Sequence, residues 1–376
     1  MGQMPLRWKI TLPGYSSTFS PPFCQIQRLT VSSHRHIPIF AMSQRAALLI
    51  GKLSHAQNEW EQVSQIASKL HTYPDGNRED FISKCKSGEF DGVYALYRSN
   101  DSNPITGDFD AELLDVLPKS LKYICHNGAG YNNIDIAACT KRGISVSSTP
   151  IAVNDATADV AIWLMLGALR NIKQSFMAVN NGKWRGNFSL GHDPKNKTLG
   201  ILGMGGIGSA VAHRAKAFGM KIQYHNRHQL PGSEEQGAKY VSFDELLRTS
   251  DVLSLNLALN PSTRHIIGKE QFNAMKDGVV IVNTARGALI DEAALVDALK
   301  SGKVWTVGLD VFEEEPKIHP GLLECENAVL LPHVGTGTYE TQRDMEILVI
   351  DNLKSAIQTD KLLTQVPEQK KDKANI

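Results

Sequence analysis

Gly203-Met204-Gly205-Gly206-Ile207-Gly208 is the stretch that decides the fold of this 376-residue chain. An apolar segment, residues 198–202, precedes it, and a segment with helical character, residues 209–218, follows it. In such a strand–turn–helix setting, glycines permit a tight turn and let the backbone approach a pyrophosphate. The free N–H groups at the start of the helix favour a phosphate. We therefore predict a dinucleotide-binding domain in which Gly203, Gly205, Gly206, Ile207 and Gly208 contact the cofactor.

The strand predicted after this turn ends at Asn226 and Arg227. NAD sites usually carry an acid there, which accepts hydrogen bonds from the ribose 2′-hydroxyl and would repel a 2′-phosphate. Asn226 removes that repulsion, and Arg227 offers a planar set of donors for a phosphate. We predict that NADP(H) is preferred, that NAD(H) is possible, and that both residues lie in the cofactor site. The alternative is that Arg227 is a solvated surface charge.

Strand-like and helix-like segments alternate along most of the chain, which predicts parallel sheets covered on both faces by helices. We expect an α/β fold of two Rossmann-like, doubly wound parallel-sheet domains, with the active site in the cleft between them. The expected strands lie at residues 46–50, 92–97, 121–125, 144–146, 199–202, 221–224, 252–256, 279–283, 304–309 and 328–331. The expected helices lie at residues 60–70, 79–87, 111–117, 134–142, 155–179, 209–218, 243–249, 269–275, 292–300 and 338–359.

The last expected helix comes too late to belong to the second domain, so we expect it to return to the first. The predicted division is an N-terminal extension at 1–45, a substrate domain at 46–149 and 335–365, a dinucleotide-binding domain at 150–334, and a tail at 366–376. Residues 368–373 read as a charged, frayed end. The apolar segment 155–179, with Asp155 as its N-cap, predicts a buried helix in a core or at an interface.

The bulk composition resembles that of a soluble globular enzyme, with 42% hydrophobic and 21% charged residues. The net charge of +1 gives no global attraction to nucleic acid or to an anionic membrane. No apolar run approaches the roughly 20 residues that span a bilayer. Five cysteines, with no C-x-x-C pair, predict reduced thiols and no metal site.

The first 58 residues contain no Asp or Glu but several Arg, Lys, Ser and Pro residues. An acid-poor, Arg-containing N-terminus can be a mitochondrial transit peptide. The plainer interpretation is an unstructured extension, and a product that starts at Met42 would keep every expected strand. We predict a cytosolic protein, with the mitochondrion as the alternative.

Three later segments supply polar side chains just beyond expected strands. Arg286 follows residues 279–283, Glu315 follows 304–309, and His333 follows 328–331. Because the carboxyl ends of parallel strands share one edge, these side chains can converge on one cleft. Alone, each is ambiguous, since a histidine after a strand is more often structural and a glutamate in an acidic run is usually solvated.

Together with the glycine turn, these segments make the chain resemble the D-isomer-specific 2-hydroxyacid dehydrogenase family, in its glyoxylate/hydroxypyruvate reductase branch. The resemblance runs from about residue 46 to 361 and includes the segments 128–135 and 149–159. It implies that Arg286 binds the substrate carboxylate and polarises the keto oxygen, that His333 is the acid/base, and that Glu315 is its partner. A carboxylate beside an imidazole stabilises the protonated ring, and an arginine can hold a carboxylate bidentately.

The resemblance also implies further contacts. The backbone N–H groups of Ala129 and Gly130 would meet the substrate carboxylate, and Arg98 and Ser99 would lie at the substrate mouth. The implied cofactor-contacting positions are Thr157, Leu257, Thr284, Ala285, Asp310, His333 and Gly335, and for Asp310 a structural role is also reasonable. The chain departs from the family pattern at Leu257-Ala258, where a proline is common, and at Asn132, where an aspartate is more usual.

The leading prediction is an NADPH-dependent reductase that converts small 2-keto acids, glyoxylate and hydroxypyruvate first, to D-2-hydroxy acids. One alternative is a reductase of a bulkier 2-keto acid, and another is a nucleotide-sensing, corepressor-like binding protein on the same fold. A formate dehydrogenase is disfavoured because the resemblance implies glutamine where Glu315 stands. A phosphoglycerate dehydrogenase is also disfavoured, because that class usually prefers NAD and often carries a C-terminal regulatory domain. The resemblance implies a homodimer formed through the cofactor domain.

Overall fold

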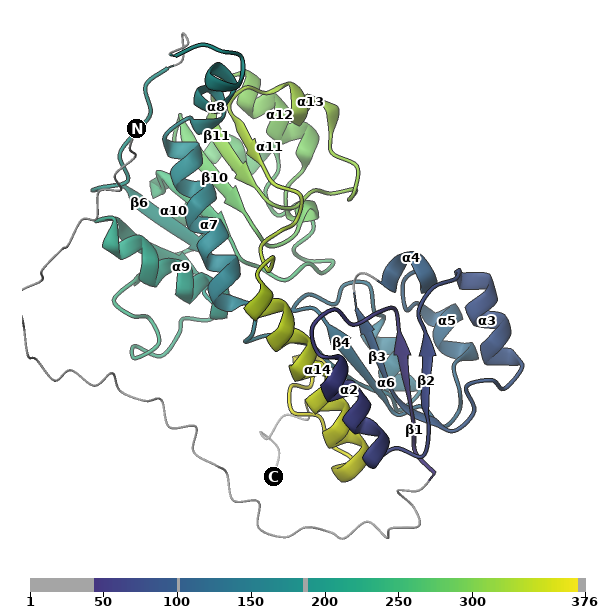
Figure 1. Cartoon of the computed structure of the whole chain (residues 1–376). Coiled ribbons are helices and arrows are strands. Elements are labelled where there is room, and N and C mark those ends of the chain that lie inside the picture. The colour runs from purple at the N-terminus through teal and green to yellow at the C-terminus, as the bar shows by residue number, and fades with distance from the viewer. Residues whose placement is uncertain (1–43, 100–101, 185–188, 371–376) are drawn as a thin grey trace, which may run out of the picture. The chain divides into compact units, whose positions relative to one another are not determined.

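The computed structural model describes residues 44–99, 102–184 and 189–370, and the N-terminal extension up to residue 43 lies outside that part. Two separate parallel sheets organise the described chain, one of five strands and one of seven (Figure 1). Helices flank each sheet (Figure 1). This arrangement confirms the expected α/β class with two parallel-sheet domains.

The five-stranded sheet has the order β2-β1-β3-β4-β5, and all its strand pairs are parallel. Side chains alternate between the faces of a strand, so a strand buried at every position must be covered on both sides. In β1, Ala46 and Leu48 join one hydrophobic cluster whereas Ala47 and Leu49 join another. The strands are β1 (Ala46–Ile50), β2 (Leu70–Tyr73), β3 (Val93–Ser99), β4 (Tyr123–Asn127) and β5 (Ser145–Ser147).

The helix α14 (Tyr339–Thr359), which follows the last strand of the seven-stranded sheet, packs against the five-stranded one. Its buried residues Val349, Ile350 and Leu353 belong to the same cluster as Ala47 and Leu49 of β1. The C-terminal helix is therefore part of the first core. The other helices around this sheet are α2 (Gln57–Glu61), η1 (Gln62–Gln65), α3 (Arg78–Lys86), α4 (Asn103–Thr106), α5 (Ala111–Val116) and α6 (Ile136–Lys141).

The seven-stranded sheet has the order β12-β11-β10-β9-β6-β7-β8. Its strands are β6 (Thr198–Leu202), β7 (Lys221–His225), β8 (Lys239–Tyr240), β9 (Val252–Leu255), β10 (Val279–Asn283), β11 (Val304–Leu309) and β12 (Ala328–Leu330). Its helical elements are α7 (Asn154–Leu169), α8 (Ile172–Asn180), α9 (Gly206–Ala217), α10 (Phe243–Thr249), α11 (Lys269–Ala274), η3 (Gly287–Leu289), α12 (Glu292–Lys300) and α13 (Pro320–Glu324). The strand order places β10, β11 and β12 side by side, and the sequence places Arg286, Glu315 and His333 after these three strands.

The expected helix at 155–179 is wrong in two respects. It is broken at Asn171, whose φ of 51° is left-handed, so α7 and α8 are separate helices. Its N-cap is Val153, not Asp155, and Val153 makes no side-chain capping bond. The Asp155 carboxylate instead accepts a hydrogen bond from Arg214 of α9 at 2.8 Å.

Two further expectations are corrected. The helix expected at 60–70 is a short α-helix and a 3₁₀ turn, and its last residue, Leu70, begins strand β2. The chain end is not frayed at Glu368–Lys370, because Val366 is fully buried and its N–H donates to the Val146 carbonyl at 3.0 Å. Residues 371–376 lie outside the described part of the chain.

The described residues contain neither a membrane-spanning helix nor a cluster of metal ligands. Within them, no helix is both long enough and apolar enough to cross a bilayer. The same residues hold no group of His, Cys, Asp and Glu side chains arranged for a metal ion. The four cysteines in this part of the chain are buried and free.

Candidate active site

The glycine turn between β6 and α9 has the geometry that a pyrophosphate requires. Gly203 has a φ of 96°, which favours glycine, and its N–H donates to the His225 carbonyl. A Cβ at Gly208 would lie 2.3 Å from the Gly203 carbonyl oxygen, so no side chain fits there. A Cβ at Gly205, the N-cap of α9, would meet no atom within 4 Å, which leaves open space before the helix. The turn and the first N–H groups of α9 therefore fit a dinucleotide phosphate.

The two residues after β7 differ in their surroundings. The Asn226 side-chain oxygen accepts a hydrogen bond from the Met204 N–H at 2.7 Å, so this side chain stabilises the glycine turn. Arg227 is exposed, and no ion pair involves it within the described residues. The sequence shows that no acid stands at this position, but it does not reveal the hydrogen bond to the turn, because that bond joins the loops after two different strands.

The predicted acid/base pair, His333 and Glu315, lies beyond β11 and β12. His333 Nδ1 is 2.7 Å from Glu315 Oε2, and Glu315 Oε1 accepts a hydrogen bond from the Phe312 N–H at 2.9 Å. Burial would raise the pKa of Glu315, but its hydrogen bonds with His333 and Phe312 outweigh burial and lower it. The carboxylate therefore stays ionised and fixes one nitrogen of the His333 ring.

Asp310, at the end of β11, holds the loop that carries His333. Its carboxylate accepts the N–H groups of Val334 and Gly335, each at 2.8 Å, and its carbonyl accepts the His333 N–H at 2.7 Å. Burial raises the pKa of Asp310 despite these hydrogen bonds. Thr157 of α7 lies against the same loop, because a Cβ on Gly335 would come within 3.6 Å of its hydroxyl. Asp310 and Thr157, both expected at the cofactor, thus contact the loop that carries His333.

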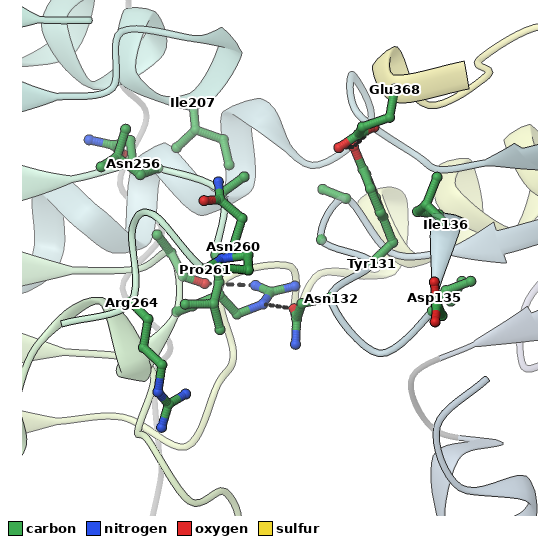
Figure 2. Close-up of a pocket in the computed structure, with 18 of the residues that line it drawn as sticks. Tyr131, Asn132, Asp135, Ile136, Ile207, Asn256, Asn260, Pro261, Arg264 and Glu368 are labelled. Carbon is green, nitrogen blue, oxygen red and sulfur yellow. Dashed lines mark hydrogen bonds between the residues drawn. The ribbon is translucent and has the colours of Figure 1, made fainter. Parts of the chain in front are cut away.

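Arg286 extends from the loop after β10 toward the loop after β4. Its Nε donates to Asn132 Oδ1 at 3.0 Å and its Nη1 to the Ala285 carbonyl at 2.6 Å (Figure 2). A Cβ on Gly130 would lie 1.9 Å from Arg286 Nη2, so the guanidinium approaches that backbone more closely than a side chain would allow. Asn283 Nδ2 donates to the Arg286 carbonyl at 2.8 Å and fixes the loop from behind. Burial lowers the pKa of Arg286, but the group remains a cation.

A pocket of about 1060 Å³ is lined by both of these loops (Figure 2). Its wall also includes Ile207 of the glycine turn and residues 256–261 after β9. The structure thus brings together seven of the expected site residues: Ala129, Gly130, Ile207, Leu257, Thr284, Ala285 and Arg286. Glu315 and His333 do not line this pocket; they follow β11 and β12, the two strands on one side of β10 in the sheet.

Arg98 and Ser99 do not lie at a substrate mouth as expected. Arg98 is fully buried, and its guanidinium donates to Asn133 at 3.1 Å and Asn103 at 3.0 Å. It also lies 4.8 Å from the centre of the Phe109 ring. Burial lowers the pKa of Arg98 to about 10, which leaves it charged at neutral pH. Arg98 thus supports the loop after β4 through Asn133, whereas Ser99 is buried and hydrogen-bonded to Ser102.

His126, at the end of β4, is a supporting residue that sequence reasoning missed. Its Nε2 lies 3.2 Å from the Gly130 carbonyl oxygen. Burial, together with the charge of Arg98, holds the pKa of His126 well below its usual value, so the ring is neutral. Its position could have indicated this role, because His126 is a polar residue at the end of a buried strand and precedes a glycine-containing loop.

Comparison with known proteins identifies the family. Residues 162–335 match the model for the D-isomer specific 2-hydroxyacid dehydrogenase, NAD binding domain. The chain is 64% identical over 325 residues to 4-methyl-2-oxopentanoate reductase A of Aspergillus oryzae. The matched region covers 86% of this chain and 98% of that relative. The chain belongs to the D-isomer-specific 2-hydroxyacid dehydrogenase family. The resemblance seen in the sequence is confirmed.

Solved structures of this dehydrogenase family share the fold. A glyoxylate reductase from Paecilomyes thermophila has 65% identity and a TM-score of 0.86, covering 87% of this chain and 99% of that one. An NADPH-dependent glyoxylate/hydroxypyruvate reductase from Sinorhizobium meliloti, in complex with NADP and malonate, has 30% identity and a TM-score of 0.74, covering 86% and 97%. Family membership makes the chain an oxidoreductase with a nicotinamide cofactor, which the glycine turn fits.

Proposed function

We propose that this dehydrogenase reduces small 2-keto acids to D-2-hydroxy acids with NADPH, and that His333 is the proton donor. The observation that carries the proposal is the 2.7 Å contact between His333 Nδ1 and Glu315. It leaves Nε2 of the ring as the nitrogen free to face a substrate. A histidine oriented by a carboxylate is suited to general acid catalysis near neutral pH.

The substrate would be held by its carboxylate. Arg286 and the backbone N–H groups of Ala129 and Gly130 line one pocket, and they offer charge-assisted donors for that group. When bound, the nicotinamide cofactor supplies a hydride to C2 of the keto acid. Arg286 fixes the face of the carbonyl that receives the hydride, and His333 delivers the proton to its oxygen.

The preference for NADPH rests on the residues after β7. Asn226 is neutral and Arg227 is exposed and without an ion pair in the described chain, so a 2′-phosphate meets a free cation and no carboxylate there. The Sinorhizobium meliloti relative is described as NADPH-dependent and binds NADP.

Glyoxylate and hydroxypyruvate are the first candidate substrates, because relatives with 65% and 30% identity are named for them. A branched 2-keto acid is the second candidate, since the relative with 64% identity is named a 4-methyl-2-oxopentanoate reductase. The pocket wall includes Ile134, Ile136 and Leu257, which can contact an apolar side chain.

A panel of 2-keto acids tests the activity. Purified protein is assayed with glyoxylate, hydroxypyruvate and 4-methyl-2-oxopentanoate, each with NADPH and with NADH. We expect kcat/KM to be higher with NADPH for every substrate that is reduced. A lack of turnover with all three acids would overturn the proposal.

The cofactor assignment is tested separately with the variant Asn226→Asp/Arg227→Ala. We expect its NADPH-to-NADH ratio of kcat/KM to fall by about a hundredfold, because the variant adds a repulsive acid and removes a phosphate donor. Arg248→Ala removes an exposed arginine elsewhere in the same domain and serves as the control. An unchanged ratio in the double variant would remove Arg227 from the 2′-phosphate site.

We also propose a cytosolic homodimer formed through the cofactor domain. Trp163 of α7 and Phe176, Met177 and Val179 of α8 are exposed apolar side chains in the single chain. Exposed apolar patches of this kind mark association surfaces. Light scattering on the purified protein tests this, and a mass of one chain at micromolar concentration would contradict the dimer.

A further inference from the structure

The pocket contains a carboxylate that the proposed reaction does not use. Glu368 of η4 (Pro367–Gln369) lines the same pocket as Arg286, although it belongs to the C-terminal segment. The Tyr131 hydroxyl lies 2.9 Å and 3.1 Å from its two carboxylate oxygens, and Figure 2 shows these side chains meeting at the pocket wall. Tyr131 directly follows Gly130, whose backbone faces Arg286.

The segment that carries Glu368 is held firmly in place. Gln369 accepts the Val146 N–H at 2.7 Å and donates to the Ile144 carbonyl at 2.8 Å and to the Thr140 hydroxyl at 2.9 Å. These bonds tie the segment to β5 and to α6 of the first core. The position of the Glu368 carboxylate is therefore set by the fold and by Tyr131, and not by a loose chain end.

The Tyr131 hydroxyl stays protonated and donates its hydrogen bond to the Glu368 carboxylate. Burial, together with the hydrogen bond to Glu368, raises the pKa of Tyr131, so the phenol remains a neutral donor. Tyr131 thus presents no free donor to a substrate while Glu368 accepts its hydrogen bond. The pocket wall at this point is an acceptor with negative charge.

The pocket is lined by two positively charged and two acidic side chains. Its lining residues include the cations Arg264 and Arg286 and the acids Asp135 and Glu368. Asp135 is used as the N-cap of α6, where its side chain accepts the Ala138 N–H at 2.9 Å. Arg264 is paired with Glu313 at 2.6 Å. Arg286 and Glu368 are the two charged groups of the lining that neither cap a helix nor form an ion pair in the described part of the chain, so we assign them the main effect on a bound anion.

We propose that Glu368, held by Tyr131, is a specificity-determining residue that disfavours 2-keto acids carrying a second carboxylate. This proposal rests on the reduction of 2-keto acids proposed above. A substrate whose first carboxylate is bound at Arg286 directs its side chain into the remaining pocket. A neutral substrate side chain is not repelled by the negative charge of Glu368, whereas a second substrate carboxylate is. The substrate class is therefore monocarboxylic 2-keto acids.

The test is the ratio of kcat/KM for 2-oxoglutarate to kcat/KM for glyoxylate, both measured with NADPH. Glu368→Gln keeps the size of the side chain and an acceptor for Tyr131 but removes the charge. We expect the ratio to rise on the order of tenfold, since the charge is exposed and partly screened. Glu368→Lys reverses the charge and should raise the ratio further. The rise should shrink in 0.5 M salt.

Matched controls separate the possible outcomes. Glu324→Gln makes the same change on the exposed surface of α13 and should leave the ratio unchanged. Tyr131→Phe keeps the charge but frees it from its tether, so an intermediate ratio is expected. An unchanged ratio in both Glu368 variants, while wild-type protein reduces glyoxylate, overturns the specificity role. A wild-type protein that reduces no 2-keto acid overturns the proposed function instead.

Discussion

The loops at the carboxyl edges of the two sheets are stabilised in different ways. At the seven-stranded sheet, two carboxylates fix the loops: Glu315 orients the His333 ring, and Asp310 accepts three hydrogen bonds through its side chain and carbonyl. At the five-stranded sheet, the loop after β4 rests on Arg98, a buried cation bonded to the amides Asn133 and Asn103.

This difference fits the function proposed for each edge. Glu315 fixes one nitrogen of the His333 ring, an orientation that the proposed proton donor needs. Arg98 is a buried cation whose guanidinium donates to amide oxygens, and its charge acts on His126, whose ring contacts the Gly130 carbonyl. We infer that this charge favours an anion at the loop that contains Ala129 and Gly130. Under the proposed function, the edge of the seven-stranded sheet supplies the proton donor and Arg286, and the loop after β4 supplies the further contacts to the substrate anion. The following predictions test that division.

The largest effect is expected at the proton-donating edge. His333→Gln keeps a polar side chain but cannot donate an acidic proton, so kcat should fall roughly a thousandfold. Binding of NADPH, followed by its fluorescence, should be retained because the glycine turn is untouched. Turnover within tenfold of wild type would remove His333 from the mechanism.

The second effect concerns the support of His333. Asp310→Asn weakens the acceptor for Val334 and Gly335, so kcat should fall by about thirtyfold with KM little changed, and unfolding should cost about 2 kcal/mol less. Asp251→Asn is the matched control, because that carboxylate also accepts a backbone N–H, from Thr198 at 2.7 Å. The control should lose stability and keep its kcat. Equal kcat values in the two variants would leave Asp310 with a purely structural role.

The third effect tests the anion-binding edge. Arg98→Met fills the buried site but removes its charge, so KM for glyoxylate should rise by about tenfold while kcat changes little. Arg98→Lys should restore part of the affinity. Arg78→Met, which removes a cation paired with Asp110 on the surface, is the control for lost stability. An unchanged KM in Arg98→Met would show that the buried charge does not act on the substrate.

The smallest effect is a pH dependence of stability. The pKa of Glu315 is lowered in the folded protein. The stability that its ionised form contributes is therefore fully present above the ordinary glutamate pKa of 4.5 and is lost as pH falls through the lower pKa of the folded state. The difference in unfolding free energy between wild type and Glu315→Gln should therefore be constant at pH 5–7 and shrink below 4.5. It should stay below about 1 kcal/mol, because the pair is partly exposed. If the difference in unfolding free energy grew as the pH was lowered, the pKa of Glu315 would be raised by folding and not lowered.

Much of the catalytic edge could be predicted from sequence because it is local to strand ends. Arg286, Glu315 and His333 each follow a buried strand, and parallel strands bring their ends to one edge. The glycine turn is equally local. Strand β2 was missed because Leu70-His71-Thr72-Tyr73 is short and half polar.

The supporting contacts could not be predicted because they join distant parts of the chain. Asn226 reaches Met204 from the next strand, and Tyr131 meets Glu368 across 237 positions of sequence. Arg98 was expected at a mouth, yet the strand alternation and packing bury it under the loop. The domain boundaries at residues 149/150 and 334/335 stay a prediction.

The most direct test of the two-edge account is the product formed from hydroxypyruvate. Wild-type protein is supplied with NADPH and hydroxypyruvate, and the resulting glycerate is resolved by chiral chromatography. If Arg286 holds the carboxylate and His333 protonates the oxygen, the hydride can reach only one face of C2. We therefore predict a single enantiomer, the D-glycerate that the family name indicates, in amounts equal to the NADPH oxidised. Racemic or L-glycerate, or NADPH oxidation without glycerate, would contradict the account.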